Sequence, residues 1–384
     1  MIFNYVNKIK NFKIKISINI FFFSIMFLFL SILFFIVKSK FKLFDKIVER
    51  EMQKTTKNIK FIICSAPIHN NFGDDAILMS TKNFLNFYFP ENKQVILYLN
   101  DISNNQRLIN YIINKEDILI INGGGYFGLY DAYVKEYVYI INYFPNNQII
   151  FFPCSIQYKK NKLKYKKIIN AYNKHKNLTI FTRDNKSHEI AEKIFKNISI
   201  YIVPDIVTRF NMSIIEKNEN RTGVLLILRK DELLLTDEDR SYINKLAKKH
   251  FNNNIFKTDS NKYVLPLGSN HETETIKFIN NISKKKLVIT DRLHGMIFSI
   301  ITGTPCIVFG NNYHKIESSY FTWFKNLEYV IFIKKEDIKI NLEDYIIKFK
   351  NLENYTIYNY KIFNHYYTLI KDILEEKINI NRKV

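Results

Sequence analysis

The sequence is poor in cysteine: its 384 residues include only 3, Cys64, Cys154 and Cys306. All three lie in or beside apolar, strand-like runs, and their spacing is not that of a metal-ligand set. They cannot all pair with one another, so a framework of disulfide bonds is not indicated. We predict buried free thiols, which suit a reducing compartment, and no metal centre.

Acidic residues are also scarce, with 36 Asp+Glu against 57 Lys+Arg and a formal net charge of +21. The lysines are scattered among Asn and Ile, without a nucleic-acid-binding signature, so we predict no nucleic-acid partner. The excess of positive charge instead favours an anionic ligand. A hydrophobic fraction of 47% excludes global disorder, and the length favours two domains.

One long segment, residues 16–37, lacks charge altogether and is dominated by Phe, Ile and Leu. Its 22 residues are long enough to cross a bilayer, and no small-residue cleavage site follows it. We predict an N-terminal transmembrane helix, and therefore a single-pass membrane protein. Four lysines precede the segment and five basic residues follow it closely, so the side of the membrane that carries the rest of the chain stays open.

From residue 61 onwards, strand and helix patterns alternate. Predicted strands lie at 61–64, 95–99, 118–121, 148–152, 178–181 and 198–203, and in a second series at 223–228, 263–266, 287–289 and 304–309. Alternating strands and helices favour parallel, doubly wound sheets. We predict an α/β fold with two Rossmann-like domains. The expected organisation is an anchor and connector (1–57), a first domain (58–205), a second domain that holds the main ligand site (206–345) and a helical tail (346–384).

The most informative motif is Thr-Asp-Arg-Leu-His-Gly-Met at 290–296, between a predicted strand and a predicted helix. Such a turn lies at the carboxyl end of a sheet, where α/β proteins bind ligands. Arg292 offers a planar cationic group, and His294 can exchange a proton near neutral pH. The start of the helix adds backbone N–H groups that favour an anion. The alternative is a buried turn in which Arg292 pairs with Asp291 and His294 packs inside. These residues alone do not decide between the two.

Other strand ends carry polar or glycine-rich turns. Asn71, Gly73 and Asp74 follow the first strand. They either form a tight turn and cap the next helix, or contact the hydroxyl groups of a ligand. Gly123 and Gly124 begin a glycine run that lets a ligand approach, although it lacks the full dinucleotide fingerprint. We predict a loop that lines a cleft.

Two further cations stand at such ends. Arg229 follows the first strand of the second series and is expected to converge with Arg292 on one anion, although a solvated charged loop is the ordinary alternative. Lys315 begins a predicted helix, an end that disfavours cations. Either a bound anion or exposure to solvent would offset the unfavourable position of this charge at the helix start.

Together these pieces resemble the polysaccharide pyruvyl transferase family, from Phe61 to about Phe324. The resemblance rests on the order and spacing of residues 70–74, 123–125, 153–158, 182–184, 204–205, 228–231, 290–295, 303–305 and 311–315. It implies a GT-B-like enzyme that moves pyruvate from phosphoenolpyruvate onto two hydroxyls of a sugar as a ketal and releases phosphate. The expected partners are phosphoenolpyruvate, a glycan or lipid-linked saccharide acceptor and a membrane, with no cofactor.

The resemblance places Arg229, Arg292 and His294 around phosphoenolpyruvate as the catalytic residues, with His294 as the best candidate acid. The expected substrate-binding residues are Asn71, Gly73, Asp74, Gly123, Gly124, Leu293 and Lys315. Two alternatives stay open: a GT-B glycosyltransferase that uses a nucleotide sugar, and a membrane-anchored glycan-binding protein without catalysis.

Overall fold

The computed structural model describes residues 59–128, 131–157, 163–216, 220–229, 234–261, 270–353 and 355–382. The chain forms two compact units, one of Met1–Lys57 with Arg107–Ile112 and one of Asn58–Gln106 with Ile113–Val384. Every element described below lies in the larger unit, apart from α4 (Gln106–Ile112), most of which belongs to the smaller. The predicted membrane segment, residues 16–37, falls outside the described residues. Among those that are described, no helix is long and apolar enough to cross a bilayer.

The first sheet is 7-stranded and parallel, in the order β2-β1-β3-β5-β6-β7 with β4 paired to β5. Its central strands are continuous apolar runs because helices cover both faces. The strands are β1 (Phe61–Ala66), β2 (Gln94–Tyr98), β3 (Ile118–Ile121), β4 (Gly124–Phe127), β5 (Gln148–Ile156), β6 (Leu178–Thr182) and β7 (Ser199–Ile202).

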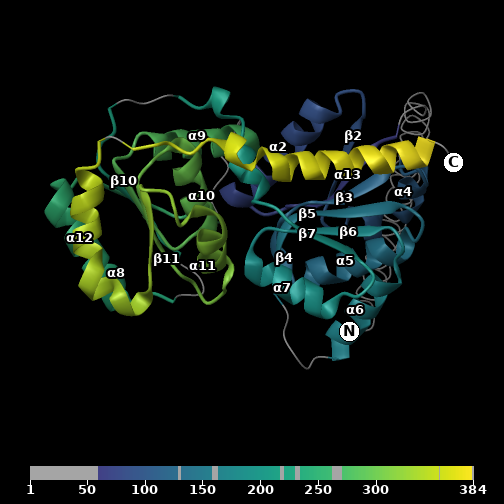
Figure 1. Cartoon of the computed structure of the whole chain (residues 1–384), viewed down its shortest axis with the longest axis horizontal. Coiled ribbons are helices and arrows are strands. Elements are labelled where there is room, and N and C mark those ends of the chain that lie inside the picture. Colours follow the sequence, from purple (N-terminus) through teal and green to yellow (C-terminus); the bar gives the residue numbers. More distant parts are fainter. Residues whose placement is uncertain are drawn as a thin grey trace, which may run out of the picture. The chain divides into compact units, whose positions relative to one another are not determined.

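The helices of this half are α2 (Phe72–Tyr88), α3 (Asp101–Asn104), α5 (Asp131–Tyr143), α6 (Leu163–Lys174) and α7 (Asn185–Ile194). In Figure 1, α2 lies on one side of the sheet and α5 and α6 on the other. The three cysteines are buried and free, as predicted.

The second sheet is 5-stranded and parallel, in the order β12-β11-β10-β8-β9. Its strands are β8 (Val224–Ile227), β9 (Ile255–Thr258), β10 (Leu287–Thr290), β11 (Cys306–Phe309) and β12 (Val330–Ile333). Residues of β8, β10 and β11 alternate between two apolar clusters, one shared with α8 (Asp237–Phe251) and α12 (Ile338–Lys350), the other with α9 (His271–Ser283) and α10 (Leu293–Thr302) (Figure 1). The prediction of parallel α/β sheets is confirmed.

The C-terminal part returns to the body through α13 (Asn364–Arg382), whose Ile370 and Leu374 are completely buried. The hydroxyl of Tyr367 is hydrogen-bonded to that of Thr208. The predicted boundary between 345 and 346 falls inside α12.

Two strands differ from the sequence-based expectation. The predicted strand at 263–266 lies outside the described residues and stays a prediction. The first difference is β9, which follows α8 at the edge of its sheet and leaves Phe256 and Lys257 exposed. Its single short apolar pair gave no strand pattern. The glycine run was interpreted as a loop, yet Gly124–Phe127 forms β4 against β5.

The strand orders fix where a ligand site belongs. The order reverses at β1, which lies between β2 and β3, and again at β8, which lies between β9 and β10. Crevices at the carboxyl ends of strands open at such reversals. The turn after β1, the glycines after β3, Arg229 after β8 and the turn after β10 all occupy these positions. The fold therefore brings motifs that are far apart in the sequence, such as the turns at Asn71 and at Arg292, to one region.

Candidate active site

A cavity of about 510 Å³ lies at these strand ends. The residues that line it come from both sheets: His69, Asn71, Asp74, Gly125, Tyr126, Ala132, Tyr133, Arg183, Arg229, Ser260, Asn261, Arg292, Leu293, His294, Asn311 and Lys315. The volume is in the range of small-molecule sites.

Hydrogen bonds to the end of β8 hold the turn after β10 in place. The hydroxyl of Thr290 accepts a hydrogen bond from the backbone N–H of Arg292 at 3.0 Å and donates one to the carbonyl of Ile227 at 2.8 Å. Asp291 accepts the backbone N–H of Arg229 at 2.7 Å. The strand ends of β8 and β10 are therefore tied together, which holds Arg229 and Arg292 next to each other.

The guanidinium of Arg292 is oriented by Asp259. Its Nε and Nη2 donate to the two carboxylate oxygens at 2.9 and 2.8 Å, a bidentate pair. Pairing with Asp291, the alternative left open by the sequence, does not occur, because that carboxylate faces Arg240 at 3.5 Å. Arg292 is thus a positioned cation on the cavity wall.

Helix α10 begins at this wall. Its N-cap, Arg292, makes no side-chain capping bond, and its first turn contains no acidic residue. The backbone N–H groups at such a start favour an anion. Leu293, whose side chain is buried, contributes to the wall at this position.

His294 lies between a carboxylate and a glycine. Its Nε2 is 3.6 Å from Oδ2 of Asp205, which is longer than a hydrogen bond, and has no hydrogen-bond partner among the described residues although it is buried. Asp205 also accepts Arg183 Nη1 at 2.6 Å and the N–H of Val207 at 2.9 Å. Burial alone would raise the pKa of Asp205, but Arg183 and His294 hold it well below its usual range. Asp205 is therefore a permanent anion beside the imidazole.

Gly73 is required by its contact with His294. A Cβ added at Gly73 would collide with the imidazole ring. We expect Gly73→Ala to destabilise the fold by about 1–3 kcal/mol and to displace the ring from Asp205. Thermal unfolding of the variant checks the first effect and loss of turnover the second. Gly310→Ala is the matched control, because its Cβ would meet no atom closer than 3.5 Å. Equal stability and turnover in both variants would contradict this account of Gly73.

Two more cations face the cavity from opposite sheets. The positions of Arg183 Nη2 and Lys315 Nζ lie 3.3 and 3.2 Å from where a Cβ on Gly125 would stand. Ser155 fixes Arg183 by accepting its Nε–H at 2.9 Å. Burial, together with the charges of Arg183 and Arg229, lowers the pKa of Lys315 to about 8. The site therefore concentrates positive charge, which an anionic ligand would relieve.

Asp74 lines the cavity from the first turn of α2. Its carboxylate is buried and lies 2.9 Å from Nε2 of His69, and the hydroxyl of Tyr126 lies 3.1 Å from the same nitrogen. Burial opposes ionisation, but the hydrogen bond with His69 and the charge of His294 lower the pKa of Asp74. The side chain of Asn71 caps α2 by accepting the N–H of Gly73 at 2.9 Å.

The structure brings most of the predicted site residues together. Those that line the cavity are Asn71, Asp74, Arg229, Arg292, Leu293, His294 and Lys315, while Gly73 supports the ring of His294. Gly123 and Gly124 are not among the lining residues. A Cβ on Gly123 would lie 2.6 Å from the carbonyl of Pro153, and Gly124 has a φ of +133°. These two glycines allow close packing of the backbone, and the glycine of the run that lines the cavity is Gly125.

Sequence reasoning missed two functional candidates. Arg183 follows the end of β6, so the strand-end argument used for Arg229 and Arg292 would have found it. For His69, the only indication in the sequence was its position in the turn after β1.

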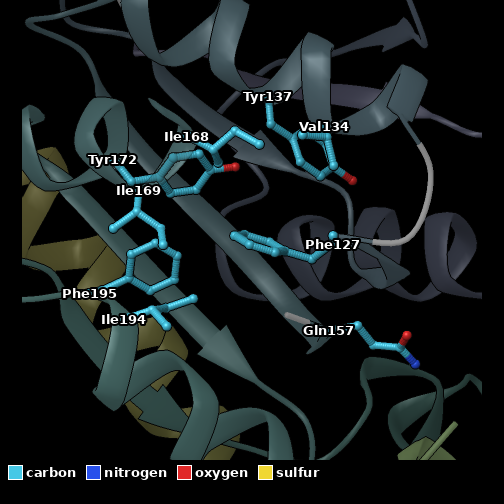
Figure 2. Close-up of a pocket in the computed structure, with 10 residues that line it drawn as sticks. Phe127, Val134, Tyr137, Gln157, Ile168, Ile169, Tyr172, Ile194 and Phe195 are labelled. Atoms are coloured by element: carbon cyan, nitrogen blue, oxygen red, sulfur yellow. The ribbon is translucent and has the colours of Figure 1, made fainter. Parts of the chain in front are cut away.

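A second cavity, behind β4, is not a ligand site. Figure 2 shows it between aromatic and aliphatic side chains, among them Phe127, Tyr137 and Tyr172. Its volume of about 10 Å³ holds at most one water molecule.

Comparison with known proteins identifies the family. The family model described as polysaccharide pyruvyl transferase matches residues 71–313, which run from the turn after β1 to the residues just before α11 (Lys315–Ser319). The chain belongs to the polysaccharide pyruvyl transferase family. The resemblance stated from the motifs is confirmed, and the protein is a transferase.

Relatives and solved structures agree with this membership. The chain is 32% identical over 292 residues to General stress protein 30 of Bacillus subtilis, covering 73% of this chain and 82% of that protein. It is 28% identical to Pyruvyl transferase 1 of Schizosaccharomyces pombe, covering 69% of each. A Listeria monocytogenes structure that carries the name of a UDP-N-acetylglucosamine 2-epimerase is similar with a TM-score of 0.52 and 12% identity, over 83% of this chain and 97% of that one. This last similarity supports the GT-B-like fold alone.

Proposed function

We propose that this pyruvyl transferase takes its pyruvyl group from phosphoenolpyruvate, attaches it to two hydroxyls of a glycan sugar as a ketal, and releases phosphate. The observation that carries the proposal is the arrangement of Arg183, Arg229, Arg292 and Lys315 around one cavity that also contains His294. Phosphoenolpyruvate presents a carboxylate and a phosphate on a three-carbon frame. Several cations at fixed positions suit such a ligand better than one cation does.

The donor would be bound at the strand ends of the second sheet. Asp259 orients the guanidinium of Arg292, Asp291 holds the backbone of Arg229, and the start of α10 adds backbone N–H groups. Lys315 supplies a compact charge from the next strand end. We propose no cofactor, because the enol phosphate itself carries the reactive carbon and the leaving group.

The reaction needs proton transfers that balance. The two hydroxyls lose two protons; one becomes part of the methyl group formed from the methylene carbon, and the other leaves on hydrogen phosphate. His294 is the proposed acid toward the methylene carbon, and its Nε2 lies 3.6 Å from the carboxylate of Asp205. Asn71, Asp74 and Asn261 are the proposed contacts of the acceptor, a glycan or lipid-linked saccharide.

Phosphate release tests the donor. The purified full-length chain is incubated with phosphoenolpyruvate or with nucleotide sugars, each in the presence of methyl glycosides of galactose, glucose, mannose and N-acetylmannosamine. We expect phosphate to form from phosphoenolpyruvate only when an acceptor is present. Transfer of sugar from a nucleotide donor would favour the glycosyltransferase alternative. Glycan binding with no turnover of either donor would favour a non-catalytic binding protein.

The lowered pKa of Lys315 predicts that the protein takes up a proton when it binds the donor. With a pKa of about 8, the side chain of Lys315 is mostly the neutral amine in the free protein above that pH, and a bound anion raises the pKa again. Titration calorimetry at about pH 9, where the phosphate is already fully ionised, should show proton uptake in buffers of different ionisation enthalpy. Lys315→Met should abolish this uptake and weaken binding. The same uptake in both proteins would remove Lys315 from the donor site.

A further inference from the structure

A second imidazole shares the cavity with His294. His69 follows β1, and its side chain is 39% exposed, whereas the Asp74 carboxylate behind it is 9% exposed. The pair resembles an acid–base dyad, with a buried carboxylate behind a histidine that a ligand can reach. By contrast, the side chain of His294 is only 12% exposed.

Among the residues that the structure describes, the contacts of His69 leave one ring nitrogen for a ligand. Both the Asp74 carboxylate at 2.9 Å and the Tyr126 hydroxyl at 3.1 Å approach Nε2. An Nε2–H that donates to Asp74 sets the tautomer with the lone pair on Nδ1. The ring of Tyr126 meets the imidazole edge-on, with centroids 5.7 Å apart, and limits its rotation. The dyad is therefore oriented before any substrate binds.

The proposed chemistry calls for two proton-transfer groups at once. In the first step the oxygen of one sugar hydroxyl forms a bond to carbon 2 of phosphoenolpyruvate, its O–H bond breaks, and the π electrons of the double bond take a proton at carbon 3. One histidine cannot give a proton to carbon 3 and accept one from the hydroxyl in the same step. Asp74 is close enough to both imidazoles to interact with each of them.

We infer that His69 is a further catalytic residue: it takes the proton of the first acceptor hydroxyl while His294 protonates carbon 3, and Asp74 positions His69. This inference rests on the proposed function. In the second step the C–O bond to phosphate breaks with its electron pair on the phosphate oxygen, and the second hydroxyl bonds to carbon 2 and returns its proton to His294. The proton held by His69 is passed to the departing phosphate, which leaves as hydrogen phosphate.

The charged surroundings of His69 predict a pH dependence. The groups that face it are Asp74 and Asp75 of α2 and Tyr126 of β4, with His294 beyond Asp74. The hydrogen bond to Asp74 raises the pKa of His69 above 6.5, against the effect of burial. A base must be neutral, so kcat/KM for the acceptor should rise with pH through that raised pKa. Asp74→Asn removes the charge and should move the midpoint to lower pH.

The test compares His69→Gln with a matched control in the full-length protein. His271 pairs with Asp75 at 3.4 Å and its side chain is 44% exposed, but it does not line the cavity. We expect His69→Gln to lower kcat/KM for the acceptor by about 100- to 10,000-fold and to lose the rising limb of the pH profile. Its affinity for phosphoenolpyruvate should stay unchanged, and His271→Gln should behave as the wild type. Imidazole in solution should restore part of the activity of His69→Ala.

The outcomes separate this inference from the proposed function. A wild-type protein that releases no phosphate from phosphoenolpyruvate with any glycoside overturns the proposed function and the inference with it. An active wild type whose His69→Gln variant keeps its pH profile overturns the role of His69 alone. An equal, pH-independent loss in His69→Gln and His69→Ala without rescue by imidazole also overturns it, since it indicates a structural role.

Discussion

His294→Gln is expected to lower turnover by about 100- to 10,000-fold while the affinity for phosphoenolpyruvate changes little. Glutamine keeps a hydrogen-bonding side chain of similar reach but cannot supply a titrating proton. The imidazole contacts Gly73 on one side, and its Nε2 lies 3.6 Å from the permanently charged Asp205. The cations that would bind the donor are other residues, so binding and proton transfer should separate cleanly.

Single-turnover kinetics and calorimetry with phosphoenolpyruvate measure the two effects. His250→Gln is the matched control, because His250 pairs with Glu343 at 2.7 Å and does not line the cavity. Near-normal turnover in a folded His294→Gln protein would remove His294 as the acid. Loss of donor affinity alone would make it a positioning residue.

Arg292→Lys should weaken phosphoenolpyruvate binding by about 1.5–3 kcal/mol, roughly a 10- to 150-fold increase in Kd. Lysine keeps the charge but has no planar fork, so it cannot hold both oxygens of Asp259 and face a ligand together. The lysine side chain would therefore either stay with Asp259 or reach the donor with less order.

Arg221→Lys provides the comparison for Arg292→Lys. Arg221 is also partly buried, and it donates to Thr304 and to the carbonyl of Thr302 rather than to the cavity. Arg221→Lys should keep donor affinity, whereas Arg292→Lys should lose it. Equal donor affinity in Arg292→Lys and the wild type would exclude Arg292 from the donor site.

The strand ends could be predicted from sequence because they depend on local pattern. Apolar runs followed by polar turns located Arg229 and the residues around Arg292 at carboxyl ends, and parallel sheets bring such ends together. The reversal of strand order at β1 and β8 then places both turns at one cavity. Periodicity and turn chemistry were enough to locate these strand ends, whereas their assignment to a ligand site came from the family resemblance.

The partners of these residues could not be predicted, since they depend on tertiary packing. Asp259, which orients Arg292, lies 33 residues earlier in the chain, just after the short edge strand β9. Asp205, beside His294, comes from the other half of the fold. Gly73 was explained by a tight turn, but the close approach of an imidazole 221 positions later in the chain is what excludes a side chain there.

The fate of the carbon atoms of phosphoenolpyruvate tests the central claim most directly. The full-length chain is incubated with phosphoenolpyruvate labelled with ¹³C at carbon 2 and the glycoside that supports phosphate release, and the product is studied by mass spectrometry and NMR. We predict a mass gain of one pyruvate less one water, with the label in a quaternary carbon that carries a methyl group and is bonded to two sugar oxygens. Phosphate released with no labelled carbon on the sugar, or label joined through a single oxygen as a stable enol ether, would contradict it.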